Sequence, residues 1–117
     1  MAIISSHTLN GSDGTHAGGI LVNLKNLNTN EYLFKTSMDN GGRLNEMLSN
    51  ESIDENANYE LTFLTNDYWK KQKNFKENIN IVDEIVIRFK MPNKNKKYHF
   101  PIILSHNSYS TWWSQGE

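Results

Sequence analysis

The sequence has no cysteine among its 117 residues and only two prolines, Pro92 and Pro101. The missing cysteine excludes thiol nucleophiles, disulfide frameworks and thiolate metal sites. No apolar stretch approaches the roughly 18 residues that a membrane-spanning helix requires. The chain also has no excess of one charge, since 12 basic residues stand against 13 acidic ones. A nucleic-acid partner calls for a concentrated basic face, so we expect neither nucleic acid nor a membrane as partner.

What is present is enough for one folded domain, which we place over residues 1–117. Apolar residues make up 37% of the chain and aromatic residues 11%. A chain of this length can bury about two thirds of its unfolded surface without a disulfide or a structural metal. The first residues have neither the basic region nor the long apolar stretch of a secretory signal. We therefore expect a cytoplasmic location for the sequence as it stands.

Hydrophobic residues recur at every second position in several short segments, as in β-strands with one covered face. Clusters of Asn, Gly, Asp and Ser separate these segments and favour turns. The pattern predicts an all-β domain, a sandwich with strands at residues 19–27, 31–38, 59–65, 82–89 and 98–104.

Two local features interrupt the strand pattern. Residues 66–72 predict one short helix, with Thr65 or Asn66 as its N-cap and Asp67 favourable in its first turn. Pro101 falls inside the last predicted strand and cannot donate a ladder hydrogen bond. We therefore expect an edge position or a bulge at Pro101.

The first candidates for chemistry are four histidines, His7, His16, His99 and His106. His99 falls on the opposite face of its strand from Tyr98 and Ile102, which points it away from the core. Such a histidine fits a cleft or a protein interface, and an ordinary solvated histidine fits the same pattern. No histidine pair has the i, i+4 spacing of a helical zinc site, and no serine lies in a Gly-Xaa-Ser-Xaa-Gly elbow. The sequence therefore gives no support to a metal site or a serine triad.

Arg43 follows two glycines, Gly41 and Gly42, which can take positive φ angles and form a tight turn. A guanidinium fixed by such a turn can bind a planar anionic or carbonyl-rich ligand, and a solvated surface arginine is the alternative. Near the C-terminus, Trp112 and Trp113 are adjacent in an expected tail strand, so their rings should lie on opposite sides. We expect one to pack inward and the other to meet a ligand or a neighbouring subunit.

Several segments are similar to motifs that occur together in one known family. Residues 6–10, Ser-His-Thr-Leu-Asn, are similar to a Thr-His-Val-Leu-Asp opening. Gly14 and Ala17 follow at the spacing of Gly-Xaa-Pro-Ala. Residues 39–43, Asp-Asn-Gly-Gly-Arg, are similar to Asn-Xaa-Asp-Gly-Arg.

The second half of the chain continues the resemblance in the same order. Residues 59–61 with 67–69 resemble a Tyr-Glu-Leu…Tyr-Phe region before a short helix. Residues 98–105, Tyr-His-Phe-Pro-Ile-Ile-Leu-Ser, followed by Tyr-Ser-Thr at 109–111, are similar to Tyr-His-Val-Pro-Leu-Leu-Leu-Ser…Tyr-Ser-Thr. Together these motifs resemble the transthyretin-like family and, within it, the 5-hydroxyisourate hydrolases.

The resemblance implies a transthyretin-type, immunoglobulin-like β-sandwich that assembles as a homotetramer, a dimer of dimers, with active sites in the channel between the dimers. It implies ring-opening hydrolysis of 5-hydroxyisourate, a small-molecule substrate from urate breakdown, without a metal or an organic cofactor. It makes His7, Arg43 and His99 the catalytic set, and it places His7, Arg43 and Trp112 at the substrate. A neutral histidine would take a proton from the attacking water while Arg43 holds the planar ring.

The sequence departs from the family at its ending, where Tyr-Arg-Gly-Ser is replaced by Trp112-Trp113-Ser114-Gln115, followed by Gly116 and Glu117. Trp112 thus stands in place of a tyrosine that helps bind substrate. The family's opening aspartate is Asn10 here, so we expect no charged partner beside His7. Transthyretin itself is a ligand carrier with this fold. The alternative is therefore a non-catalytic binding protein for a small planar ligand, in which Trp112 and Trp113 reshape the channel.

Overall fold

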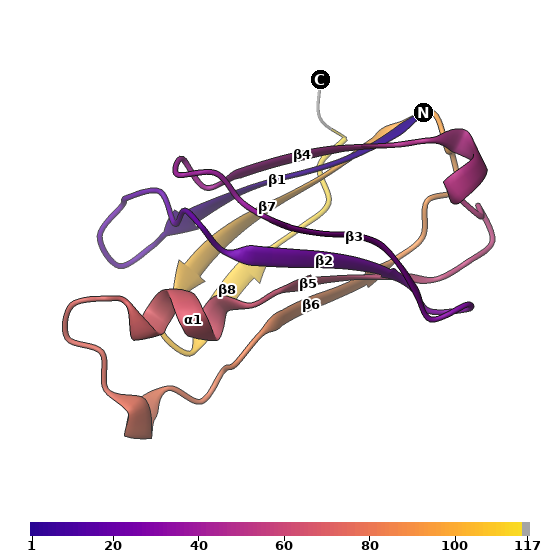
Figure 1. Ribbon diagram of the computed structural model, residues 1–117. Coiled ribbons are helices and arrows are strands. Elements are labelled where there is room, and N and C mark those ends of the chain that lie inside the picture. Colours follow the sequence, from indigo (N-terminus) through magenta and orange to yellow (C-terminus); the bar gives the residue numbers. More distant parts are fainter. Residues whose placement is uncertain (116–117) are drawn as a thin grey trace.

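A computed structural model describes residues 1–115 as two four-stranded sheets in two layers, with one short helix at the end of the sandwich (Figure 1). Gly116 and Glu117 lie outside the described residues. The first sheet has the order β4 (Arg43–Leu48), β1 (Ala2–Asn10), β7 (Lys97–Ser105) and β8 (Ser108–Thr111). The second has the order β3 (Glu31–Ser37), β2 (Leu21–Asn26), β5 (Tyr59–Phe63) and β6 (Ile85–Phe89). The predicted all-β class is confirmed.

The core lies between the sheets and consists of the inward side chains that a period of two predicts. Its large, fully buried members come from both layers and include Ile4, Ile102, Leu104, Leu24, Tyr59, Leu61, Phe63 and Ile85. Full burial of such a side chain is worth about 1.5–3 kcal/mol. Because these residues fix the inward face of β1, β2, β5, β6 and β7, the residues between them must face outward.

β1 and β4 supply half of the first sheet but do not follow from the hydrophobic pattern. On β1 the inward positions after Ile4 are polar, and Ser6 and Thr8 are nonetheless buried. The Ser6 hydroxyl donates to the carbonyl of Phe100 at 2.6 Å, and the Thr8 hydroxyl donates to the carbonyl of Ala17 at 2.6 Å. These bonds remove the cost of burying the hydroxyls, so a central strand forms without an apolar stripe.

The predicted short helix is present as α1 (Thr65–Lys70), but its predicted cap is wrong. The N-cap position is Leu64, and no side chain caps the helix. Thr65 and Asn66 lie inside α1, where the Thr65 hydroxyl and the Asn66 N–H both donate to the carbonyl of Asp83. The two polar residues therefore tie α1 to the segment before β6. Two 3-10 turns, η1 (Asn50–Ser52) and η2 (Glu77–Ile79), complete the helical elements. Within residues 1–115 no helix is long and apolar enough to cross a membrane.

Pro101 lies inside the sheet, so the prediction of an edge position or a bulge is wrong. β7 pairs in parallel with β1 and antiparallel with β8. The ladder to β8 ends at Ile102 and Thr111, and one further bridge joins His99 to Ser114 in the same register. Pro101 stands between these two points and has no N–H to donate. The result is a gap in the ladder with the register kept on both sides.

Candidate active site

A cross-strand row of side chains lies on the outward face of the first sheet. His7 on β1 is the direct partner of Arg43 on β4 and of Pro101 on β7. The register kept across the gap in the ladder sets Trp112 opposite Pro101. Adjacent strands are about 4.8 Å apart. The structure thus places Arg43, His7 and Trp112, three of the predicted site residues, along one line across the sheet.

His99 lies beside this row, one outward position along β7 from Pro101. Its outward orientation, predicted from the sequence, is confirmed, because Tyr98 and Phe100 on either side are buried. The direct partner of His99 on β1 is Ser5, and the Ser5 hydroxyl is 2.8 Å from Nδ1 of His99. This bond occupies Nδ1 and leaves Nε2 as the nitrogen available to a ligand.

The turn before β4 fixes the position from which Arg43 projects. Gly42 has a φ of 71°, as the sequence predicted for one of the two glycines. One carboxylate oxygen of Asp39 accepts hydrogen bonds from the backbone N–H of Gly41 and of Arg43, each at 2.9 Å. The N–H of Gly42 also donates to the carbonyl of Asp39 at 3.0 Å. The arginine therefore enters its strand from a closed, hydrogen-bonded turn.

His16 is one of the four histidine candidates from the sequence but has no predicted place in the site, and the structure sets it beside His7. Its Nδ1 is 2.9 Å from Nε2 of His7. It stands between Gly14 and Ala17, where the resembling motif has proline, and this departure was the signal available in the sequence. The fourth histidine, His106, is outside the site, because it bonds Asn80 and stacks on Trp69 of α1.

Asn10 does not contact His7, so the replacement of the family's aspartate by asparagine at this position does not remove a partner of His7. It lies three positions along β1, which places it on the inward face, and it is buried. Its side chain donates to the hydroxyl of Tyr68 at 3.0 Å and accepts from the N–H of Ser12 at 2.9 Å. An aspartate at this position would act on the loop and on α1 rather than on His7.

Burial is the main cause that lowers the pKa of His7 below the ordinary imidazole value, and the charges of Arg43 and His16 lower it further. A backbone hydrogen bond to Gly41 and the carboxylate of Asp39 act in the opposite direction. Because the ordinary imidazole pKa is about 6.5, the ring of His7 is neutral at pH 7.

The pKa of His99 is also lowered, again mainly by burial. The positive charge of Lys97, that of His7 when its ring is protonated, and that of Arg43 add to this effect. The site thus combines two neutral imidazoles, each with a lone pair for a proton, and one permanent guanidinium. Within residues 1–115, no three His, Asp or Glu side chains converge in an arrangement that could hold a metal ion.

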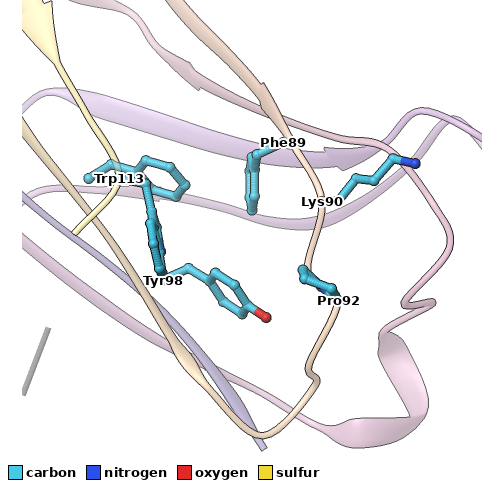
Figure 2. Close-up of a pocket in the computed structure, with 6 residues that line it drawn as sticks. Phe89, Lys90, Pro92, Tyr98 and Trp113 are labelled. Atoms are coloured by element: carbon cyan, nitrogen blue, oxygen red, sulfur yellow. The ribbon is translucent and has the colours of Figure 1, made fainter. Parts of the chain in front are cut away.

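The two adjacent tryptophans lie on opposite sides of the chain, as predicted. Trp113 falls opposite Phe100 and lines an apolar pocket of about 300 Å³ together with Phe89 and Tyr98 (Figure 2). Trp112 falls on the outward face. Neither ring is fully packed, since Trp112 is 49% and Trp113 53% exposed. The apolar pocket is therefore separate from the row that holds His7 and Arg43.

Known proteins share this fold and sequence pattern. A 5-hydroxyisourate hydrolase of Halalkalibacterium halodurans is 29% identical over 112 residues, which cover 93% of this chain and 94% of that protein. The structure of Klebsiella pneumoniae 5-hydroxyisourate hydrolase superposes with a TM-score of 0.77 at 22% identity, covering 97% of this chain and 99% of that one. Sea bream transthyretin in complex with thyroxine gives a TM-score of 0.80 at 18% identity, covering 97% and 96%.

These structures confirm the transthyretin-type sandwich that the motifs implied. Their identities lie below 25%, so they speak for the fold alone. The family assignment rests on the sequence, because the model of the HIUase/Transthyretin family matches residues 4–113. The chain therefore belongs to the HIUase/Transthyretin family.

Proposed function

We propose that this protein hydrolyses 5-hydroxyisourate by opening its ring, with His7, Arg43 and His99 as catalytic residues. The observation that carries the proposal is the outward face of the first sheet, where two neutral histidines and an arginine lie on three adjacent strands. The full-length similarity to a protein named 5-hydroxyisourate hydrolase supports the choice of substrate.

In the proposed reaction a histidine acts as general base toward water. The water attacks a ring carbonyl while the imidazole takes its proton, and a C–N bond of the ring then breaks. The second histidine orients the water or returns a proton to the leaving nitrogen. Arg43 holds the planar ring and stabilises the negative charge that develops on the attacked carbonyl oxygen. Trp112, at the end of the row, lines the substrate site.

The proposed assembly is a homotetramer in which two dimers bring their outward faces together. The first sheet offers a surface for this, because Met47, Ile103 and Trp112 project from it with large exposed apolar side chains. Exposed apolar groups that gather on one face mark an interaction surface. The proposed active sites then lie in a channel between the facing sheets.

Alanine variants of the three residues test the function. We expect His7→Ala, Arg43→Ala and His99→Ala each to lower kcat/KM about 10²-fold or more while the protein remains folded. His106→Ala is the matched histidine control and should keep the wild-type rate. Normal rates in all three site variants would contradict the assignment.

The second candidate is a non-catalytic carrier of a small planar ligand. It is favoured by the exposed indole of Trp112 at the end of the row and by the fold shared with sea bream transthyretin. A planar ligand stacked on that indole would change its fluorescence. A saturable fluorescence change with purine analogues, lost in Trp112→Ala and without any turnover of 5-hydroxyisourate, would establish the carrier.

A further inference from the structure

His16 lies within hydrogen-bond distance of a proposed catalytic residue but has no role in the hydrolysis described above. Its Nδ1 is 2.9 Å from Nε2 of His7, and the two ring centroids are 5.0 Å apart. We infer that His16 is a positioning residue for His7, which holds the ring through Nε2 and passes to solvent the proton that His7 takes up. The catalytic part of this inference rests on the proposed hydrolase function, and the pairing itself does not.

The backbone holds His16 in place although its side chain is exposed. The segment after β1 folds back along it, so that His16 and Leu9 form a bridge. The N–H of Ala17 donates to the carbonyl of Thr8 at 3.0 Å, and the hydroxyl of Thr8 donates to the carbonyl of Ala17 at 2.6 Å. Leu9 is the outward residue next to His7, and bridge partners share a face. His16 is therefore a fixed diagonal neighbour of His7.

The contact between the two rings constrains where protons can lie. A hydrogen bond between two imidazole nitrogens needs one N–H and one lone pair. When His7 gains a proton on Nδ1, its Nε2–H donates to Nδ1 of His16. Transfer of that Nε2 proton to His16 leaves His7 neutral with its proton on Nδ1, and His16 then carries the charge. His16 in turn releases the proton from its own Nε2 to water.

The charges around His7 favour this direction of transfer. Arg43 on β4 opposes a positive charge on His7, whereas the backbone of Gly41 and the carboxylate of Asp39 in the turn favour one. His99 on β7 is the other titratable group coupled to His7.

His16 is exposed, so water can solvate its positive charge. This proton relay therefore moves charge from a confined, cationic place to solvent and leaves His7 neutral. When Nδ1 of His7 later gives up its proton, the two transfers run in reverse and restore the tautomer that accepts a proton.

Two substitutions at position 16 distinguish the two proposed roles of His16, which are to hold the ring of His7 and to accept its proton. His16→Asn keeps an amide at the place of Nδ1 and so keeps a hydrogen bond to His7, but the amide cannot take a proton. His16→Ala loses both. Thr15→Ala is the control, because the side chain of this exposed neighbour bonds the carboxylate of Asp13 in the same loop, and alanine keeps the backbone bonds of Thr15.

The pairing is measured first, by ¹⁵N NMR of the histidine rings in the free protein over a pH series. We expect His16→Ala to change the tautomer balance of His7 because the bond at Nε2 is lost, and to raise its midpoint of protonation because the neighbouring charge that lowers it is removed. The asparagine variant should keep the wild-type tautomer. Unchanged ring shifts and midpoint of His7 in His16→Ala would overturn the pairing.

The relay is measured by turnover of 5-hydroxyisourate in weak buffer. We expect both His16 variants to lower kcat about tenfold with little change in KM, and added imidazole to restore the rate. Loss of kcat without rescue by imidazole, or no loss at all, would overturn the relay. If the wild-type protein itself shows no turnover, the proposed hydrolase function fails, and the NMR series still decides whether His16 positions His7.

Discussion

His7 and His99 differ in what fixes their rings. His99 is bonded through Nδ1 to a hydroxyl, that of Ser5, and His7 is bonded through Nε2 to another imidazole. The serine offers one hydroxyl, whereas a second imidazole offers both a proton donor and a proton acceptor. We therefore expect the hydrogen bond of His99 to stay the same during the reaction, and the tautomer of His7 to depend on where His16 carries its proton.

The pH dependence of the reaction follows from the direction of the two pKa shifts. Both pKa values are lowered, mainly by burial, so both rings stay neutral below the ordinary imidazole value of about 6.5. As the pH falls, protonation removes the base, and kcat/KM must decline. We expect the midpoint of that acid limb below pH 6.5, measured from initial rates between pH 5 and 8. A midpoint above pH 7 would mean that the histidines are charged at neutral pH, contrary to the proposed role of base.

The same shifts affect stability. A histidine with a lower pKa in the folded state binds more protons when unfolded, so acid favours unfolding. We expect Tm to fall as the pH drops below about 6.5, and to fall less in His99→Gln, which lacks one of the shifted groups. An equal fall in the variant and in the wild type would contradict the shift at His99.

At this scale the sequence predicted the orientation of residues on one strand but not contacts between strands. His99 could be placed outward because Tyr98 and Ile102 show the alternation. Ser5 and His16 could not be found in this way. Ser5 bonds His99 from the neighbouring strand, and His16 bonds His7 from the loop after β1. The alternation within one strand does not predict which residues of another segment lie opposite it.

Among the elements, the turn that leads into β4 positions the site most directly. Gly42 takes a positive φ, and a Cβ there would lie 2.5 Å from the carbonyl oxygen of Thr8. That carbonyl belongs to β1, one residue after His7. The glycine thus allows β4 to approach β1 closely enough to set Arg43 against His7.

Replacing Gly42 by alanine tests this element. We expect Gly42→Ala to lower the free energy of unfolding by about 3 kcal/mol or more, from strain and a backbone clash together, and to lower kcat/KM because Arg43 shifts. The matched control is Gly14→Ala, since Gly14 also has a positive φ but open space around it. It should cost only the strain of about 1–2 kcal/mol and leave kcat/KM unchanged. Chemical denaturation and steady-state rates measure both, and equal effects of the two variants would contradict the close approach.

The elements that the sequence predicted well are those whose inward residues are apolar. β2, β5 and β7 alternate cleanly, and their predicted and observed ranges overlap. β1 could not be recognised, because buried hydroxyls with partners elsewhere in the fold replace its apolar stripe. The missed strand carries His7, so the pattern alone could not bring the site residues together, and the family motifs were needed.

For the whole molecule, the two outer faces of the sandwich differ in what they carry. The face of the first sheet holds the candidate site and the exposed side chains of Met47, Ile103 and Trp112. The proposed tetramer covers this face. We expect Ile103→Glu to split the tetramer into dimers, because a charge buried in an interface costs several kcal/mol.

Analytical ultracentrifugation of the 13.5 kDa chain measures this assembly. The control is Val86→Glu, since Ile103 is 40% and Val86 42% exposed, and Val86 lies on the outer face of the second sheet. The control should remain a tetramer. A wild-type protein that sediments as a monomer, or an Ile103→Glu variant that keeps the tetramer, would contradict the proposed interface.

The most direct test of the proposed function is the ultraviolet decay of freshly generated 5-hydroxyisourate with the purified protein. The decay is compared with the spontaneous rate and with the His99→Ala variant at equal concentration. We predict clear acceleration by the wild-type protein and its loss in His99→Ala, with Trp112 in place of the usual tyrosine. A folded tetramer that leaves the spontaneous rate unchanged would contradict the hydrolase and favour the carrier of a planar ligand.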